Sequence, residues 1–319
     1  MVGMDQKPSL QEMIDAVIKT FIVAHADDGD AHLAQALVYN AGRLAWRLRE
    51  MGVSVEQKTS ISDVVTDADR AAERFVAGVL EAVRPEDGLV GEEGTARESQ
   101  SGRNWVIDPV DGTYNFSSGS DYWCSALALT DATGITLGAV HRPAMGYTWF
   151  GGRDYPTSLD GKEVARLEEK PAEQISLSTY LHPTSLVDAD IRGAWQRVAE
   201  NFATVRMLGA GSVDLSSVAD GTWGAWMQHS VADWDWFPGK ALVEAAGGTP
   251  NPPKPANPFT TEELRVWMER FMTESATHSQ SAHEEWRQAH GGPSAQTITT
   301  RLGPWREVLE NLGGGQREG

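Results

Sequence analysis

A pair of aspartates at a strand-to-turn transition is the densest chemical signal in this sequence. The segment 108–113 reads Asp-Pro-Val-Asp-Gly-Thr and follows the apolar run 105–107, Trp-Val-Ile. Two carboxylates three positions apart can converge there on hard cations that take oxygen ligands, and the backbone carbonyl of Val110 can add a further oxygen. The amides of Gly112 and Thr113 would open a short helix or nest that suits phosphate oxygens. For such a motif taken alone, an Asx-type turn with solvated aspartates is the alternative.

Other carboxylates stand at the ends of predicted elements. The segment 91–93, Gly-Glu-Glu, ends a strand, residues 63–69 lead into a helix, and residues 234–235, Trp-Asp, precede another helix. Loops at the ends of elements gather into functional sites, so each segment is a candidate. The alternative for each is a helix N-cap or a solvated loop end, and we adopt that alternative for Asp63 and Asp67.

Apolar periodicity predicts the elements that must position these residues. Helices are predicted over 9–25, 31–51 and 72–83, and short strands over 88–92, 104–110, 122–130, 135–143, 147–153 and 175–181. The chain then alternates helix 185–201, strand 203–208, helix 212–221, strand 224–228 and helix 233–246. The first half is therefore predicted to combine helices with a sheet, with residues 1–30 contributing an accessory helix.

The character of the chain changes after Gly248. Five prolines lie within residues 249–258, a composition typical of a stiff linker. A helix with a capping pattern from Thr260 to Glu263 is predicted next, and a last one from Pro304 to Gly313. Residues 273–300 are rich in Ser, Thr, His and Gln and are expected to be loosely ordered.

Composition excludes several classes of partner. The chain has 319 residues, enough for one large two-lobed unit or two domains, and its 27 Lys and Arg against 45 Asp and Glu give a net charge of −18. Without a basic patch, nucleic acid and anionic membranes are poor partners. The apolar stretches are too short to cross a bilayer and the N-terminus does not read as a secretory signal, so a cytoplasmic location is expected. Carboxylates that hold divalent cations would still let an acidic protein bind a phosphorylated substrate.

Taken together, the acidic segments resemble those of the inositol monophosphatase family of Mg²⁺-dependent, lithium-sensitive phosphatases. The family pattern appears here as DVVTDAD at 63–69, GEE at 91–93, WVIDPVDGTYNF at 105–116 and WDWFPGKALVEAAGG at 234–248. The resemblance extends from about residue 31 to Gly248. It implies an α+β fold, the layered α-β-α-β-α sandwich of the sugar phosphatases, with an N-terminal lobe over 1–145, a C-terminal lobe over 146–248 and an atypical helical tail over 249–319.

The resemblance also implies metal ligands. Glu92, Asp108 and the carbonyl of Val110 correspond to ligands of a first Mg²⁺, and Asp108, Asp111 and Asp235 to ligands of a second. Asp108 would bridge the two ions, and Glu92 would help to hold a third, weaker one. Two to three ions per site are therefore expected.

The remaining catalytic positions follow in the same way. Asp69 and Thr113 resemble the pair that orients and deprotonates the attacking water, with Glu92 beside them. Lys58 stands where the family has a loop lysine, and a solvated loop charge is the alternative for it. The implied mechanism is a direct in-line attack of metal-activated water on phosphorus, without a phosphoenzyme.

The phosphate and its alcohol would contact two groups of residues. Asp111, Gly112 and Thr113 would hold the phosphate. The small residues that match the turn beside the substrate are Gly209, Ala210 and Gly211.

One position leaves the substrate open. Gln228 stands where inositol-specific members place a glutamate, and an amide changes both the charge and the donor pattern. Inositol monophosphate is the first candidate among small phosphorylated metabolites, and histidinol phosphate is the alternative.

Two other functional classes are less favoured by the sequence. A bisphosphate-specific phosphatase ranks lower because residues 114–116, Tyr-Asn-Phe, follow the monophosphatase form, and an inactive regulatory relative is disfavoured by the intact acidic set. Dimers are usual in the family. After Gly248 the family continues through a strand and a final helix, whereas this chain has its Pro-rich segment, so either the tail helices replace that packing or the second lobe is incomplete.

Overall fold

The structure is a computed structural model that describes residues 9–52, 55–57, 64–249, 261–275, 277–290, 293, 298, 302 and 305–313. The chain divides into two compact units, Met1–Pro250 and Asn251–Gly319.

Three helices open the first unit: α1 (Leu10–His25), α2 (Asp30–Met51) and α3 (Asp67–Val83). Helix α1 begins with a capping box of Ser9 and Glu12, and α3 with one of Thr66 and Asp69, so that side chains satisfy the first free amides. The predicted helices are confirmed. Helix α3 begins five residues before its apolar stripe. The stripe did not indicate this start because the first turn of the helix is polar.

An eight-stranded sheet forms the centre of this unit. In spatial order its strands are β10 (Lys162–Glu163), β9 (Tyr155–Leu159), β8 (Tyr147–Gly152), β7 (Gly134–Arg142), β6 (Cys124–Asp131), β5 (Asn104–Asp111), β3 (Gly88–Gly91) and β4 (Ala96–Arg97). Strands β3 and β5 are parallel and the other neighbours are antiparallel. A separate antiparallel pair, β1 (Val55–Gln57) and β2 (Val64–Thr66), precedes α3.

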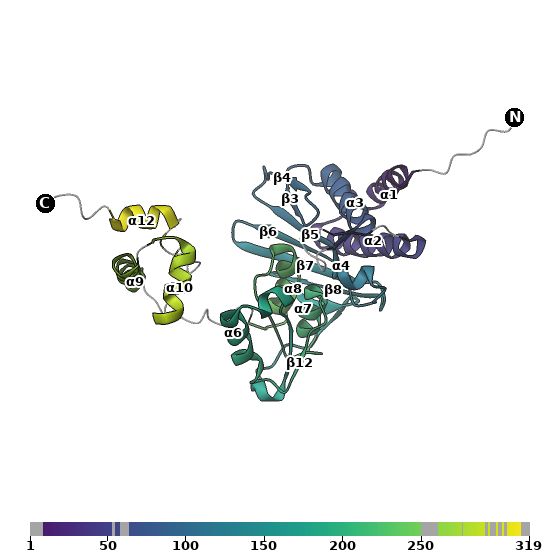
Figure 1. Cartoon of the computed structure of the whole chain (residues 1–319). Helices are drawn as coiled ribbons and strands as arrows, with labels where there is room; N and C mark the ends of the chain where they lie inside the picture. The colour runs from purple at the N-terminus through teal and green to yellow at the C-terminus, as the bar shows by residue number, and fades with distance from the viewer. Residues whose placement is uncertain are drawn as a thin grey trace. The chain divides into compact units, whose positions relative to one another are not determined.

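Helices cover both faces of this sheet (Figure 1). Because side chains alternate along a strand, Leu127 and Leu129 of β6 join the core formed with α1, α2 and α3. Ala126 and Val140 face the other way, into a core with α7 (Gly211–Ala219) and α8 (Asp233–Ala245). The sheet therefore lies between two helical layers.

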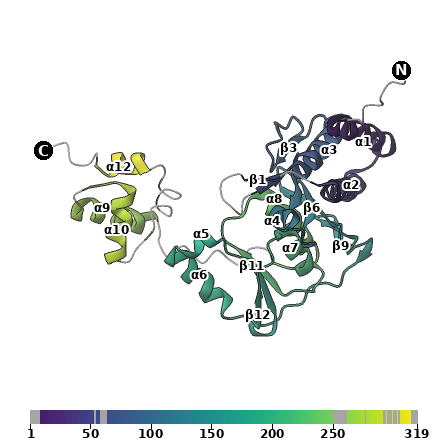
Figure 2. The same ribbon diagram turned by 45° about the vertical axis from the view of Figure 1, so that its right-hand side comes forward.

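A second, smaller sheet lies beyond α7. Its strands run in the order β12 (Thr204–Arg206), β11 (Ser176–Tyr180) and β13 (Ala225–Gln228), all parallel. On its other side are α5 (Pro183–Leu186) and α6 (Ala189–Ala199), and Trp195 of α6 donates a hydrogen bond to Thr179 of β11, 2.9 Å (Figure 2). The short η1 (Ala172–Gln174) leads into β11. The fold is thus the expected α+β, α-β-α-β-α layered sandwich.

The second unit is helical. Among the described residues, the helices with defined bounds are α9 (Thr261–Glu274), α10 (Gln280–His290) and α12 (Trp305–Gly313). Leu264, Met268 and Phe271 of α9 share a buried core with Ile298 and Val308. The expectation that residues 273–300 are loosely ordered was wrong for α10, because its few apolar residues pack on α9: Trp286 lies 5.0 Å from Trp267 between ring centroids.

Within the parts of the chain that the structure describes, no helix is both long and apolar enough to cross a membrane.

Candidate active site

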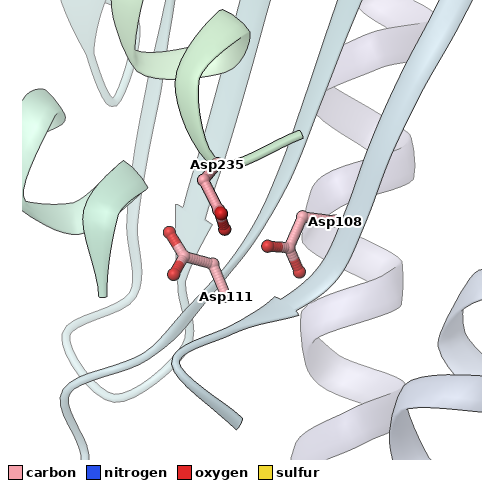
Figure 3. Close-up of side chains that lie close together, drawn as sticks. All are labelled: Asp108, Asp111 and Asp235. Carbon is pink, nitrogen blue, oxygen red and sulfur yellow. The ribbon is translucent and has the colours of Figure 1, made fainter. Parts of the chain in front are cut away.

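Three aspartates from two distant segments meet beside the large sheet. Asp108 and Asp111 lie at the end of β5, and Asp235 lies in the first turn of α8. One carboxylate oxygen from each lies within 4.8 Å of the others, and Figure 3 shows the three groups facing one another. Asp108 and Asp111 are only 1% and 5% exposed. Such a group of buried oxygen ligands fits a hard divalent cation.

The local geometry of the β5 end explains how both aspartates point the same way. The pairing of β5 with β6 shifts register between Asp108 and Asp111, which releases the strand from its alternation. Asp108 Oδ1 accepts a hydrogen bond from the Val110 amide, 3.1 Å. The Asx-type turn foreseen as the alternative is therefore present, but its carboxylate is buried rather than solvated.

The turn after β5 requires a glycine. Gly112 has φ 93°, a conformation that favours glycine, and a Cβ there would lie 3.0 Å from the Ala210 Cβ, so a side chain would be strained and tightly packed. The short helix α4 (Thr113–Ser117) begins at the next residue. The amides of Gly112 and Thr113 are thereby placed at the start of a helical turn next to Asp111.

The electrostatics of the cluster are unfavourable without a counter-ion. Burial raises the pKa of Asp108 well above its usual range, and the charges of Glu92, Asp111 and Asp235 raise it further. Burial likewise raises the pKa of Asp111, and burial followed by the charges of Asp111 and Glu92 raises the pKa of Asp235 to about 7. Divalent cations would neutralise these like charges, so the donor set fits a metal site.

Glu92 reaches the same site from the turn between β3 and β4. Its amide donates a hydrogen bond to the carbonyl of Ile107 in β5, 3.2 Å. Its charge acts on both Asp108 and Asp235. Glu92 therefore acts electrostatically on two of the three aspartates, but it is not part of the group whose carboxylate oxygens lie within 4.8 Å of one another, and its role as a metal ligand stays a prediction.

Asp69 and Thr113 form a pair beside the cluster. The Thr113 hydroxyl lies within donating distance of Asp69 Oδ1, 2.9 Å, and of the Val110 carbonyl, 3.0 Å. Asp69 Oδ2 accepts hydrogen bonds from the amide of Thr66, 3.0 Å, and from its hydroxyl. Burial raises the pKa of Asp69 to about 6 against the opposing effect of these bonds. A carboxylate held this way can take up a proton near neutral pH.

Comparison with known proteins decides the family. The sequence profile described as the inositol monophosphatase family matches residues 28–289, most of the chain. This chain belongs to the inositol monophosphatase family. Members of this family hydrolyse phosphoric monoesters, so the protein is a phosphatase acting on small phosphorylated substrates, and the family is metal-dependent.

Individual relatives carry different names. A histidinol-phosphatase of Mycobacterium tuberculosis is 34% identical over 230 residues, which cover 69% of this chain and 85% of the relative. A fructose-1,6-bisphosphatase/inositol-1-monophosphatase of Thermotoga maritima is 29% identical over 210 residues, covering 65% and 79%.

Solved structures share the fold. The extragenic suppressor protein suhB from Bartonella henselae superposes with a TM-score of 0.64 at 22% identity, over 68% of this chain and 84% of that one. An IMPase from Thermotoga maritima gives a TM-score of 0.58 at 26% identity, over 74% and 83%.

One end of the small-residue turn of this family member binds Asp111 directly. The amides of Gly211 (3.1 Å to Oδ1) and Ser212 donate hydrogen bonds to the Asp111 carboxylate from the N-terminus of α7. The turn is therefore brought to the cluster, although Gly211 lies 100 residues along the chain from Asp111. The positive end of the α7 dipole also stabilises the charged form of Asp111.

The other two residues of this turn serve its shape. Gly209 has φ 79°, a conformation that favours glycine, and its carbonyl accepts a hydrogen bond from the Asn115 side chain, 3.3 Å. Ala210 is buried and occupies the N-cap position of α7 without a side-chain capping bond. Gly209 thus has a backbone role at the turn. The substrate contact expected of Gly209, Ala210 and Gly211 stays a prediction.

Sequence reasoning missed Asn115 as a residue that holds the site together. Its side-chain amide donates to the carbonyls of Tyr122, 2.9 Å, and Leu208, 2.7 Å, as well as to Gly209, and so ties α4 to the small-residue turn. Asn115 lies inside the segment that resembles the family pattern, but no spacing rule indicates which carbonyls an asparagine will reach.

Other predicted site residues lie on different elements. Gln228 ends β13, where it is half-buried and paired with Tyr180 of β11 in the smaller sheet. Asp67 occupies the first turn of α3 with its side chain 48% exposed, in line with its interpretation as a helix-start residue. Lys58 and Asp63 lie outside the described residues.

Proposed function

We propose that this family member is a Mg²⁺-dependent phosphatase that hydrolyses a small phosphate monoester, with inositol monophosphate as the first candidate substrate. The observation that carries the proposal is the convergence of Asp108, Asp111 and Asp235 beside the hydrogen-bonded pair of Asp69 and Thr113. Acidic groups for cations and a polarised hydroxyl then lie side by side.

The oxygen ligands would be shared among the ions. Glu92, Asp108 and the Val110 carbonyl would hold one Mg²⁺, and Asp108, Asp111 and Asp235 would hold another, with Glu92 contributing to a third. The choice of Mg²⁺ is supported by its preference for carboxylate and carbonyl oxygens and by its binding together with substrate phosphates. When bound, the cations lower the pKa of the attacking water and neutralise the leaving alkoxide.

The protein's own groups position water and phosphate. Thr113 donates its hydroxyl proton to Asp69, so its oxygen lone pairs can accept a hydrogen bond from the attacking water. Asp69, whose pKa lies at about 6, takes up the proton that the water loses through Thr113. The amides of Gly112 and Thr113 hold the phosphate oxygens in line with that water. The new bond forms from water oxygen to phosphorus as the bond to the alcohol oxygen breaks.

The substrate site is proposed to lie between the N-terminal lobe, to about residue 145, and the C-terminal lobe, to Gly248. The turn of Gly209, Ala210 and Gly211, together with Gln228, would contact the alcohol part of the ester from the C-terminal lobe. An amide at Gln228 accepts and donates hydrogen bonds without charge, which permits alcohols other than inositol. Histidinol phosphate is the second candidate, because a relative named histidinol-phosphatase is similar over most of the family region.

A substrate panel tests the proposal. Purified protein is assayed for phosphate release from inositol 1-phosphate, histidinol phosphate, glycerol 2-phosphate and fructose 1,6-bisphosphate, with Mg²⁺ and with excess chelator. We expect turnover with Mg²⁺ only, highest kcat/KM for inositol 1-phosphate, and inhibition by Ca²⁺, whose larger radius favours looser coordination. Full activity in chelator would exclude the metal mechanism, and a preference for histidinol phosphate would select the second candidate.

Gln228→Glu tests the alcohol contact. A charge-assisted acceptor should raise kcat/KM for inositol 1-phosphate relative to glycerol 2-phosphate. The expected rise corresponds to roughly 1–2 kcal/mol of additional transition-state stabilisation. An equal change for both substrates would show that Gln228 does not touch the alcohol.

A further inference from the structure

A carboxylate that the catalytic scheme does not use is buried next to the site. Glu73 lies on α3, one helical turn after Asp69, and is 2% exposed. A buried carboxylate is costly unless its oxygens are hydrogen-bonded. Each oxygen of Glu73 accepts one backbone bond: Oε2 from the Glu93 amide, 2.8 Å, and Oε1 from the Thr95 amide, 2.9 Å.

Both amides belong to the tight turn that joins β3 to β4. The turn is closed by the Gly91 amide bonded to the Thr95 carbonyl, 2.8 Å, and Gly94 has φ 102°, a conformation that suits glycine. Glu92 lies inside this turn. The two hydrogen bonds to Glu73 therefore hold the backbone of the turn that carries Glu92 against helix α3.

Gly91 gives a second, independent sign of this coupling. Its φ is not in the left-handed region, so its backbone conformation does not demand glycine. A Cβ built on Gly91 would instead lie 2.6 Å from the Glu73 carboxyl carbon, with the two carboxylate oxygens 2.6 and 2.8 Å away. The absence of a side chain at position 91 leaves the space that the Glu73 carboxylate occupies.

We propose that Glu73 is a positioning residue for the metal site: it holds the turn 91–95 so that Glu92 faces Asp108 and Asp235. This role rests on the proposed function, in which Glu92 is a metal ligand. Helix α3 then serves the site twice, through Asp69 beside the aspartate cluster and through Glu73 behind the Glu92 turn. Because the two are four residues apart, they lie on the same face of the helix.

Metal affinity of the full chain tests the role. Glu73→Gln keeps the shape of the side chain but presents an NH₂ group to one of the two amides, so one bond is lost. Mg²⁺ and Mn²⁺ binding is measured by calorimetric titration and by the metal-dependent rise in unfolding temperature. We expect Glu73→Gln to weaken metal binding by about 10-fold or more, as removal of groups that orient metal ligands does. Glu81→Gln, an exposed carboxylate on the same helix, is the matched control and should bind as wild type does.

A double-mutant cycle separates positioning from simple destabilisation. Gly91→Ala should weaken metal binding in the wild-type background, because its methyl group displaces the Glu73 carboxylate. In a Glu73→Ala background the three atoms nearest to that methyl group are gone, so Gly91→Ala should cost much less there. If Glu73→Gln unfolds, Gly91→Ala in the wild-type background is the deciding variant, because it keeps the Glu73 side chain and only displaces it, and unchanged metal affinity there would overturn the role.

The outcomes separate the two proposals. Wild-type affinity in folded Glu73→Gln, or equal Gly91→Ala costs in both backgrounds, would overturn the role of Glu73 while leaving the metal site in place. A wild-type protein that binds neither Mg²⁺ nor Mn²⁺ would overturn the metal site and, with it, this role.

Discussion

At the scale of single residues, the site combines groups whose like charges oppose folding. Burial and neighbouring carboxylates raise the pKa of Asp108 and Asp235, and burial raises that of Asp111, so the metal-free protein is destabilised at neutral pH. The same arrangement of carboxylate oxygens fits a divalent cation. A substitution that removes the charge of one of these carboxylates is therefore expected to lower activity and to stabilise the metal-free fold.

Asp108→Asn tests whether this carboxylate is needed for activity. The substitution removes a charge and one strong oxygen ligand from the carboxylate proposed to bridge two ions. We expect kcat to fall by far more than about 10-fold, measured with saturating Mg²⁺. A variant that loses less than about 1.4 kcal/mol of transition-state stabilisation would show that Asp108 does not bridge.

The stability of the metal-free protein is measured as its unfolding temperature in excess chelator at several pH values. Asp235 has its folded pKa raised to about 7, above its unfolded value, so its contribution to stability is present at about pH 4 and is lost as pH rises towards 7. His141, whose pKa burial lowers to about 4, has the opposite pH dependence over part of this range. Because His141 is present in both proteins, its contribution cancels in the difference between the unfolding temperatures of wild type and Asp235→Asn. We expect the unfolding temperature of the variant to exceed that of wild type increasingly towards pH 7, and a constant difference would contradict the raised pKa.

Thr113→Ala tests the proposed water-positioning pair. Its backbone amide survives the substitution while the hydroxyl bonded to Asp69 is lost, so kcat should fall with KM nearly unchanged. Thr113→Ser is the matched control and should retain most of the activity. Asp69→Asn should behave like Thr113→Ala, and the double variant should lose little more than either; strictly additive losses would separate the two side chains.

At the scale of elements, α8 must lie close to the large sheet for Asp235 to reach the β5 end. Gly138 of β7 makes this approach possible, because a Cβ there would lie 2.3 Å from the Pro238 carbonyl of α8. The helix and sheet therefore meet with backbone against backbone. A strand glycine without a turn role marks such a contact.

Gly138→Ala is expected to push α8 away from β7. Overpacking of this kind costs about 1–3 kcal/mol of unfolding free energy. Because α8 carries Asp235, the affinity for Mg²⁺ should fall as well. Gly29→Ala, where no atom lies within 4 Å of the new Cβ, is the control. Chemical denaturation and metal titration of both variants check the expectation, and an unchanged metal affinity in Gly138→Ala would show that the contact does not position Asp235.

At the scale of the whole molecule, the site and the C-terminal helices belong to different compact units. The four carboxylates proposed as metal ligands, together with Asp69, Thr113 and the turn 209–211, all lie in Met1–Pro250. The unit Asn251–Gly319 has its own buried core on α9. The proposed chemistry is thus confined to the first unit.

A chain ending at Pro250 should retain Mg²⁺-dependent phosphatase activity. We expect its kcat to stay within about 3-fold of the full chain, equivalent to less than about 0.7 kcal/mol. Phosphate release and thermal unfolding of the two chains provide the measurement. A folded but inactive Met1–Pro250 chain would assign the C-terminal unit a part in the reaction.

The sequence by itself determined the elements and the list of chemical groups. Apolar periodicity located the helices and the longer strands, because burial on one face imposes a repeat that local sequence displays. The spacing of Asp108 and Asp111 after a buried strand indicated a metal site, and together with the segments around Asp69, Glu92 and Asp235 it indicated the family and the layered fold.

Only the tertiary structure decided how those groups are held. Hydrogen bonds hold them, and these bonds join residues 20 to 101 positions apart in the sequence. They run from the amides of Gly211 and Ser212 to Asp111, from the turn 91–95 to Glu73, and from the Asn115 side chain to the carbonyls of Leu208 and Gly209. No periodicity predicts them, because they follow from how layers pack and not from the local chain. The helix α10 was missed for the same reason: its sequence is polar, and its few apolar side chains find their partners on α9.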